Sequence, residues 1–159
     1  MPMQVLVNIF IGVLWMFFND DWSVLTFFSG YLFGLLVLFV LRRFMASEYY
    51  PLTLYAVLKL LLIFIYELLT SSILVIRKII RPKVNIKPGI YKLETSLQGD
   101  IEVTLLALLI TLTPGSVVME ISADKKILYV HAMDFPEVSD AVLQSKNRFE
   151  EAIKKVTRP

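Results

Sequence analysis

Two long stretches without a charged side chain open this sequence. Residues 1–19 carry none, and twenty more uncharged residues follow from Trp22 to Leu41. At about 1.5 Å per residue, a helix of twenty residues crosses a hydrocarbon core of about 30 Å. Hydrophobic residues make up 57% of the 159 residues, whereas soluble domains have roughly 45–50%. Because so short a chain cannot bury that excess in one soluble core, we expect membrane helices.

The two stretches are predicted to form helices at about 3–19 and 22–41 that both span the membrane. Only Asn19-Asp20-Asp21 separates them, so they must be antiparallel neighbours joined by a tight acidic turn. Gly30 and Gly34 have the G-x-x-x-G spacing, which allows the backbone of a neighbouring helix to approach closely. This spacing is also compatible with an ordinary membrane helix that tolerates glycine.

A third apolar stretch, at about 52–80, contains ionisable residues. On a helical wheel Lys59, Tyr66, Thr70 and Arg77 form a thin polar stripe, with Glu67 at its edge. A charge at membrane depth is costly, which makes Lys59, Glu67 and Arg77 candidates for contact with a partner subunit. The alternative is an interfacial helix whose charged ends reach the headgroups. For Glu67, which is nearest the middle of the helix, we favour the partner-facing position.

The basic residues indicate which side of the membrane each end occupies. The first turn has two aspartates and no basic residue, whereas Arg42 and Arg43 follow the second helix and further Lys and Arg residues begin at Arg77. Under the positive-inside rule both ends of the third stretch belong in the cytoplasm. We therefore expect two spanning helices, cytoplasmic termini, and a third helix along the cytoplasmic leaflet or against partner subunits. The alternative is three crossings.

The second half is predicted to be a small α/β domain at 81–159, separated by Pro82 and Pro88-Gly89 from the membrane helices at 1–80. Its elements are expected in the order β-α-β-β-α, as a small mixed sheet with one right-handed crossover and one hairpin, covered by two helices. The expected ranges are a strand at 90–97, a helix at 101–113 with Asp100 as N-cap, strands at 117–122 and 127–133 joined by a turn at 123–126, and a helix from 136 to about 156.

Few residues in this sequence are suited to catalysis or metal binding. There is no cysteine, and His131 is the only histidine, so we expect neither a metal nor a cofactor. No glycine-rich phosphate loop or nucleophile elbow is present, and Ser116 has no identifiable base. The net charge of +2 argues against a nucleic-acid partner. An enzyme is therefore not expected.

Two short motifs resemble a known family. The run Leu112-Thr113-Pro114-Gly115-Ser116 leads into a hydrophobic strand, and a second strand reads Leu128-Tyr129-Val130-His131-Ala132-Met133. Together they resemble the E subunit (MrpE or MnhE) of the Mrp multisubunit Na+/H+ antiporters, whose pattern has an L-T-P-G-T turn and an L-x-V-H-x-L strand. The departures are Ser116 in place of Thr and Met133 in place of Leu. The resemblance extends over the whole chain.

This resemblance implies a non-catalytic accessory or scaffolding subunit of a cation/proton antiporter in the bacterial cytoplasmic membrane. The expected partners are other Mrp subunits and membrane lipid, with the C-terminal domain in the cytoplasm. The main alternative is a free-standing membrane-anchored cytoplasmic binding module. That alternative requires a concave site lined by polar groups in the α/β half.

Overall fold

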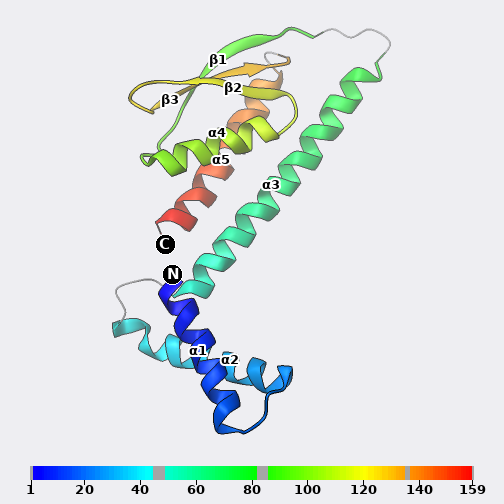
Figure 1. Ribbon diagram of the computed structural model, residues 1–159. Coiled ribbons are helices and arrows are strands. Elements are labelled where there is room, and N and C mark those ends of the chain that lie inside the picture. The colour runs from blue at the N-terminus through cyan, green and yellow to red at the C-terminus, as the bar shows by residue number, and fades with distance from the viewer. Residues whose placement is uncertain (1, 45–48, 82–85, 135–136, 159) are drawn as a thin grey trace. The chain divides into compact units, whose positions relative to one another are not determined.

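The computed structural model describes residues 2–44, 49–81, 86–134 and 137–158. It contains two compact units, Met1–Tyr55 and Ala56–Pro159. The first unit is helical and the second contains a three-stranded sheet with helices (Figure 1). The expected arrangement of a helical half followed by an α/β half is confirmed at this level.

The first unit is built on a helical hairpin of α1 (Pro2–Phe18) and α2 (Val24–Leu41). A Cβ atom added at Gly30 would lie 2.5 Å from that of Trp15, and one added at Gly34 would collide with the Asn8 side chain. Gly30 is closer to the turn and faces Trp15, whereas Gly34 is further from the turn and faces Asn8. This order along the two helices confirms the antiparallel pairing. The G-x-x-x-G spacing serves close approach of the two backbones.

The three apolar helices differ in whether they are long enough to cross a membrane. The segment Val24–Phe44, which adds the 3-10 turn Arg42–Phe44 to α2, and α3 (Tyr50–Ile79) are long and apolar enough to cross a membrane. The 17 residues of α1 give about 25 Å, which is short of a core of about 30 Å. The two helices that meet the length criterion are therefore the second and third, whereas the sequence predicted the first and second.

Polar side chains hold the start of α3 to the hairpin inside the first unit. The Tyr50 backbone N–H donates to Gln4 Oε1 at 2.9 Å, and Asn8 Nδ2 donates to the Tyr50 hydroxyl at 2.8 Å. Tyr31 and Tyr50 share a further hydrogen bond of 2.7 Å between their hydroxyls. Because Gln4, Asn8 and Tyr50 are all buried, these bonds satisfy polar groups that would be costly to bury alone.

The second unit has the expected order of elements after α3. They are β1 (Gly89–Glu94), α4 (Asp100–Leu112), β2 (Ser116–Ile121), β3 (Ile127–Ala132) and α5 (Glu137–Thr157). The strand order is β1-β3-β2, and both pairings are antiparallel. The prediction of a mixed sheet was wrong, because β3 lies between β1 and β2 and separates the two strands that the crossover joins.

The predicted N-cap of α4 was wrong by one residue. The N-cap residue is Gly99, and Asp100 is the first residue of the helix. Glu102 lies in the first turn, and its Oε2 accepts the backbone N–H of Gln98, just before the helix, at 3.1 Å. The same carboxylate receives a two-pronged contact from Arg158, with Nε at 2.9 Å and Nη2 at 2.7 Å. These bonds tie the end of α5 to the start of α4.

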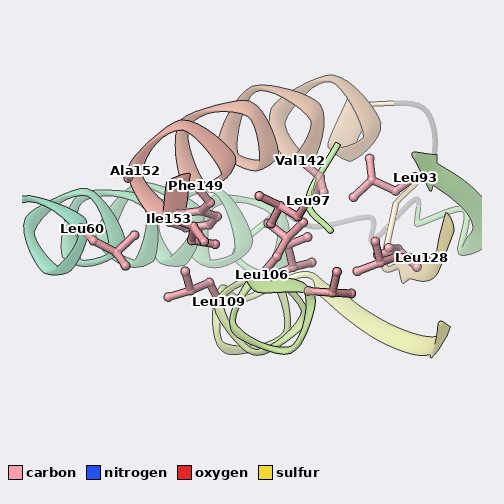
Figure 2. Packing of buried hydrophobic residues seen from close by; sticks show 13 residues of the cluster. Leu60, Leu93, Leu97, Leu106, Leu109, Leu128, Val142, Phe149, Ala152 and Ile153 are labelled. Carbon is pink, nitrogen blue, oxygen red and sulfur yellow. The ribbon is translucent and has the colours of Figure 1, made fainter. Parts of the chain in front are cut away.

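One apolar core joins the elements of the second unit. Leu106 and Leu109 of α4 meet Phe149 and Ile153 of α5 beneath the inward-facing residues of the sheet (Figure 2). Leu60 of α3 is 7% exposed and belongs to the same cluster. Part of the third apolar helix is therefore packed against the α/β domain and not surrounded by lipid.

Candidate functional site

The structure brings the two family motifs together at one end of the sheet. Ser116 pairs with Ala132 and Val117 with His131 in the β2–β3 ladder. The Met133 backbone N–H donates to the Gly115 carbonyl at 2.9 Å, which extends the contact into the turn. The motifs are two separate runs in the sequence, 112–116 and 128–133, and they form one continuous piece of structure.

Local hydrogen bonds fix the turn that follows α4. The hydroxyls of Thr113 and Ser116 are buried and both donate to the Ile110 carbonyl, at 2.7 and 3.1 Å. They satisfy a carbonyl that the end of the helix leaves without a partner. Gly115 has φ +103°, a backbone conformation that residues with a side chain rarely adopt. The predicted helix stop is confirmed, and a glycine occupies the position where positive φ requires one.

Two motif residues of β3, Tyr129 and His131, lie on the face of the sheet opposite the core. His131 lies between Ile90 and Val117 in the register. Tyr129 lies between Lys92 and Glu120, and the Lys92 ammonium is 5.9 Å from the centre of its ring. Among the described residues, no group of three or more His, Cys, Asp or Glu side chains could hold a metal. With these neighbours, His131 and Tyr129 contribute to a mixed apolar and polar surface.

Glu67 has an ionic partner within its own chain. Arg148 Nη1 of α5 donates to Glu67 Oε1 at 2.7 Å, and the Ser145 hydroxyl donates to Oε2 at 2.6 Å. The Glu67 side chain is 9% exposed, whereas that of Arg148 is 49% exposed. The contact with the carboxylate also raises the pKa of Arg148. A cation from another subunit is not required to neutralise Glu67.

A second ion pair joins α3 to the domain further along the helix. Lys78 donates to Asp134, which lies just after β3. The Lys87 backbone N–H donates to the other carboxylate oxygen at 3.3 Å. The Lys78 contact, assisted by the Lys87 bond, lowers the pKa of Asp134. Sequence reasoning missed both Arg148 and Asp134, because no local pattern links them to α3.

Between these two ion pairs lies a cavity of about 240 Å³. Its lining combines Glu67, Ser71 and Lys78 of α3 with the motif turn and with α5, which contributes Arg148. Three segments that are far apart in the sequence thus form one concave surface. The polar stripe predicted on the third helix lines this cavity in part.

The other two candidate charges of α3 lie elsewhere. Lys59 and Arg77 are both exposed, and within the described ranges neither forms an ion pair. The structure therefore does not bring the three candidate residues together. Contact of Lys59 and Arg77 with a partner subunit stays a prediction.

The chain matches a family described as Na+/H+ ion antiporter subunit (MNHE) over residues 8–156. It is 44% identical to the E subunit of the Na+/H+ antiporter of Bacillus subtilis (strain 168) and 40% identical to that of Alkalihalophilus pseudofirmus. Both alignments cover 99% of this chain and 100% of the relative. The E1 subunit of the Staphylococcus saprophyticus antiporter is 35% identical over 98% of each chain.

Two solved structures also resemble this chain. A chain of the membrane-bound sulfane sulfur reductase, an archaeal respiratory membrane complex, has a TM-score of 0.57 at 20% identity, covering 96% of this chain and 98% of that one. A chain of the Mrp complex from Dietzia sp. DQ12-45-1b is 30% identical with a TM-score of 0.46, covering 61% of this chain and 94% of that one. The first of these likenesses concerns the fold alone. From the family match and the full-length relatives, the chain belongs to the Na+/H+ ion antiporter subunit family, among its E subunits.

Proposed function

We propose that this chain is a non-catalytic accessory subunit of a multisubunit Na+/H+ antiporter in the cell membrane, where it supports assembly with the other subunits. Relatives that align over their full length are named as subunits of such an antiporter. The α/β domain faces the cytoplasm in this proposal. The observation that carries the accessory role is the placement of charge in the apolar helices.

A proton relay through a membrane protein needs titratable groups at membrane depth. The sequence of α1 and α2 contains no charged residue. In α3, Glu67 and Lys78 each form an ion pair with the α/β domain of the same chain. Neither the α1–α2 hairpin nor α3 therefore offers a continuous proton relay. This supports an assembly role for the chain and leaves ion transport to other subunits.

The packing of α3 also supports the cytoplasmic placement of the domain. Leu60, Glu67 and Lys78 span most of the helix, and each contacts the α/β domain. A helix with a soluble domain along one side cannot have lipid all around it. This arrangement favours α3 at the cytoplasmic surface over a crossing that would carry the domain to the outside.

Single-cysteine labelling tests the orientation, and the chain has no native cysteine to remove. Asn19, in the acidic turn, and Lys155, on α5, are both exposed. In intact cells a reagent that cannot cross membranes should modify a cysteine at Asn19 but not one at Lys155. Permeabilised cells should show both. Labelling of Lys155 alone in intact cells would overturn the topology.

The partner-facing role of Lys59 and Arg77 is tested by assembly. Removing a cation that pairs with a buried carboxylate of another subunit strands that carboxylate, at a cost of about 3–5 kcal/mol. We expect Lys59→Gln and Arg77→Gln to lower the recovery of other subunits after mild detergent extraction. The exposed Lys155→Gln serves as control. Recovery at the parental yield from both variants would remove the ion-pair hypothesis.

The cavity beside Glu67 favours a second candidate function, a binding module. It is a concave site lined in part by polar groups, with one wall from α3 and the rest from the α/β half, whereas that alternative requires such a site in the α/β half. Co-purification separates the two candidates, because a free-standing module would be recovered without larger membrane subunits. A ligand site and an accessory role are also compatible within one chain.

A further inference from the structure

The cavity beside Glu67 differs from a simple packing gap in the chemistry of its walls. Leu74, Val142 and Met133 give it apolar surface, and Ser71 adds a hydroxyl group. Its volume of about 240 Å³ is slightly below the roughly 300–1,000 Å³ of sites that enclose a whole drug-sized ligand. The space therefore suits one part of a ligand, such as a headgroup with its first methylene groups.

The charged residues of the lining favour an anion. Among the described residues that line the cavity, Arg148 and Lys78 are cationic and Glu67 is anionic, while Asp134, which pairs with Lys78, lies outside the lining. The Glu67 carboxylate already has a donor on each oxygen, from Arg148 and Ser145, so it has little attraction left for a cation.

Arg148 has unused capacity to donate hydrogen bonds. A guanidinium carries five N–H donors. The Nη1 group donates to Glu67, and the Tyr66 side chain, whose ring centre is 5.7 Å from the guanidinium carbon, is a second contact, so further donors remain. The Arg148 side chain is 49% exposed, against 9% for the Glu67 side chain. The guanidinium is therefore the member of the ion pair that a ligand can reach. Its planar geometry matches phosphate oxygens in a two-pronged contact.

The helix that forms one wall determines where such an anion comes from. Outside the contacts with the domain, α3 exposes Leu62, Leu69 and Ile73, which are 66%, 59% and 50% exposed. A helix with this surface is in contact with lipid or with apolar partners. If α3 lies at the cytoplasmic leaflet, as proposed above, the cavity is next to a surface rich in anionic lipid headgroups.

We propose that this cavity binds the headgroup of an anionic phospholipid, with Arg148 donating to the phosphate and the apolar wall of Leu74 and Val142 holding the adjoining methylenes. The inference rests on the proposed placement of α3. The site is built from α3, the motif turn and α5, so a bound lipid fastens the α/β domain to the membrane surface. It gives the motif turn a role in ligand binding.

Native mass spectrometry of the full-length protein, purified in mild detergent with its co-purifying subunits, tests the proposal. The probes are phosphatidylglycerol, phosphatidylcholine and inorganic phosphate, each titrated separately. We expect phosphatidylglycerol to bind at least tenfold more tightly than phosphatidylcholine. Equal binding of the two lipids would overturn the proposal, and so would saturation of the same site by inorganic phosphate at lower concentration than the lipid.

Two site variants and one control variant test whether the lipid binds in this cavity. The double variant Glu67→Gln with Arg148→Gln removes the cation without stranding the carboxylate, and Ser71→Phe fills the cavity without changing its charge. Both should reduce phosphatidylglycerol binding at least tenfold, while the exposed Lys155→Gln on the same helix as Arg148 should bind like the parent. Parental binding by both site variants would refute the assignment.

Two further measurements keep the outcomes distinguishable. Resistance to proteolysis, compared with the parent, shows that each variant folds, and a variant that fails this check is replaced by Leu74→Trp, which also occupies the cavity. The cysteine-labelling pattern at Asn19 and Lys155 reports the orientation independently of lipid. A cytoplasmic domain that shows no preference for phosphatidylglycerol would refute the lipid site and leave the accessory function standing.

Discussion

The ion pair between Glu67 and Arg148 should respond very differently to the removal of each end. The carboxylate is 9% exposed and the guanidinium is 49% exposed. Glu67→Gln keeps an acceptor for Arg148 and leaves a cation that water can reach. Its cost should be at most about 1 kcal/mol, as for exposed ion pairs.

Arg148→Gln has the opposite consequence, because it leaves a charged carboxylate in a poorly hydrated position. The Ser145 hydroxyl then remains as its hydrogen-bond donor within the described structure. Breaking a fully buried pair costs about 3–5 kcal/mol, and the residual exposure of the carboxylate reduces this to about 2–4 kcal/mol. For a unit of about 100 residues, where 1 kcal/mol corresponds to about 4–8 °C, the midpoint should fall by roughly 8–32 °C.

Pulse proteolysis in denaturant measures this difference on the full-length protein, because cleavage reports the unfolded fraction of the α/β unit. The double variant should be nearly as stable as Glu67→Gln alone, since it removes the stranded charge. Lys155→Gln serves as the surface control. If Arg148→Gln costs no more than Glu67→Gln, or if the double variant costs the sum of the two, then the carboxylate is hydrated and the reasoning is refuted.

Three other changes probe separate features, each with its own measurement. Gly115→Val should destabilise the α/β unit by about 1–3 kcal/mol through backbone strain, measured by proteolysis. Gly99→Ala, at φ −91°, should destabilise it less. Equal destabilisation by the two variants would contradict the strain. Gly34→Ala should weaken the α1–α2 hairpin, seen as reduced helical protection in hydrogen exchange, whereas Ser29→Ala on the exposed face should not. Arg158 and neighbouring donors lower the pKa of Glu102 to about 2, so the stability that Glu102 adds is present above about pH 4.5 and is lost as pH falls towards 2. The difference in stability between the parent and Glu102→Gln should therefore vanish over that range. A difference that stays constant with pH would contradict this.

The sequence predicted the elements more reliably than their neighbours in space. Alternation along 127–132 identifies the inward-facing Leu128 and Val130, and both are buried. Alternation fixes which face a residue occupies, but it does not state which strand lies beside which. The mixed sheet was expected for that reason, and the position of β3 between β1 and β2 depends on tertiary packing.

The candidate site was predictable in part from the polar stripe on α3. Tyr66, Glu67 and Thr70 were expected to face something other than acyl chains, and all three line the cavity. Arg148 lies 81 residues further along the chain, on a helix rich in charged residues, so nothing local marks it as the partner. Long-range ion pairs of this kind are set by the packing of helices, which one sequence does not disclose.

The central position of β3 has a consequence for synthesis of the chain on the ribosome. In the described sheet β1 pairs with β3, whose first residue, Ile127, follows Glu94 by roughly thirty residues. At about 5–20 residues per second, β1 waits a few seconds for its hydrogen-bonding partner. During that interval the apolar helix α4 has been made but has no sheet to cover it. The domain therefore closes in one late step, and a nascent chain that stalls before β3 presents an uncovered apolar helix beside the membrane into which its first half is being inserted.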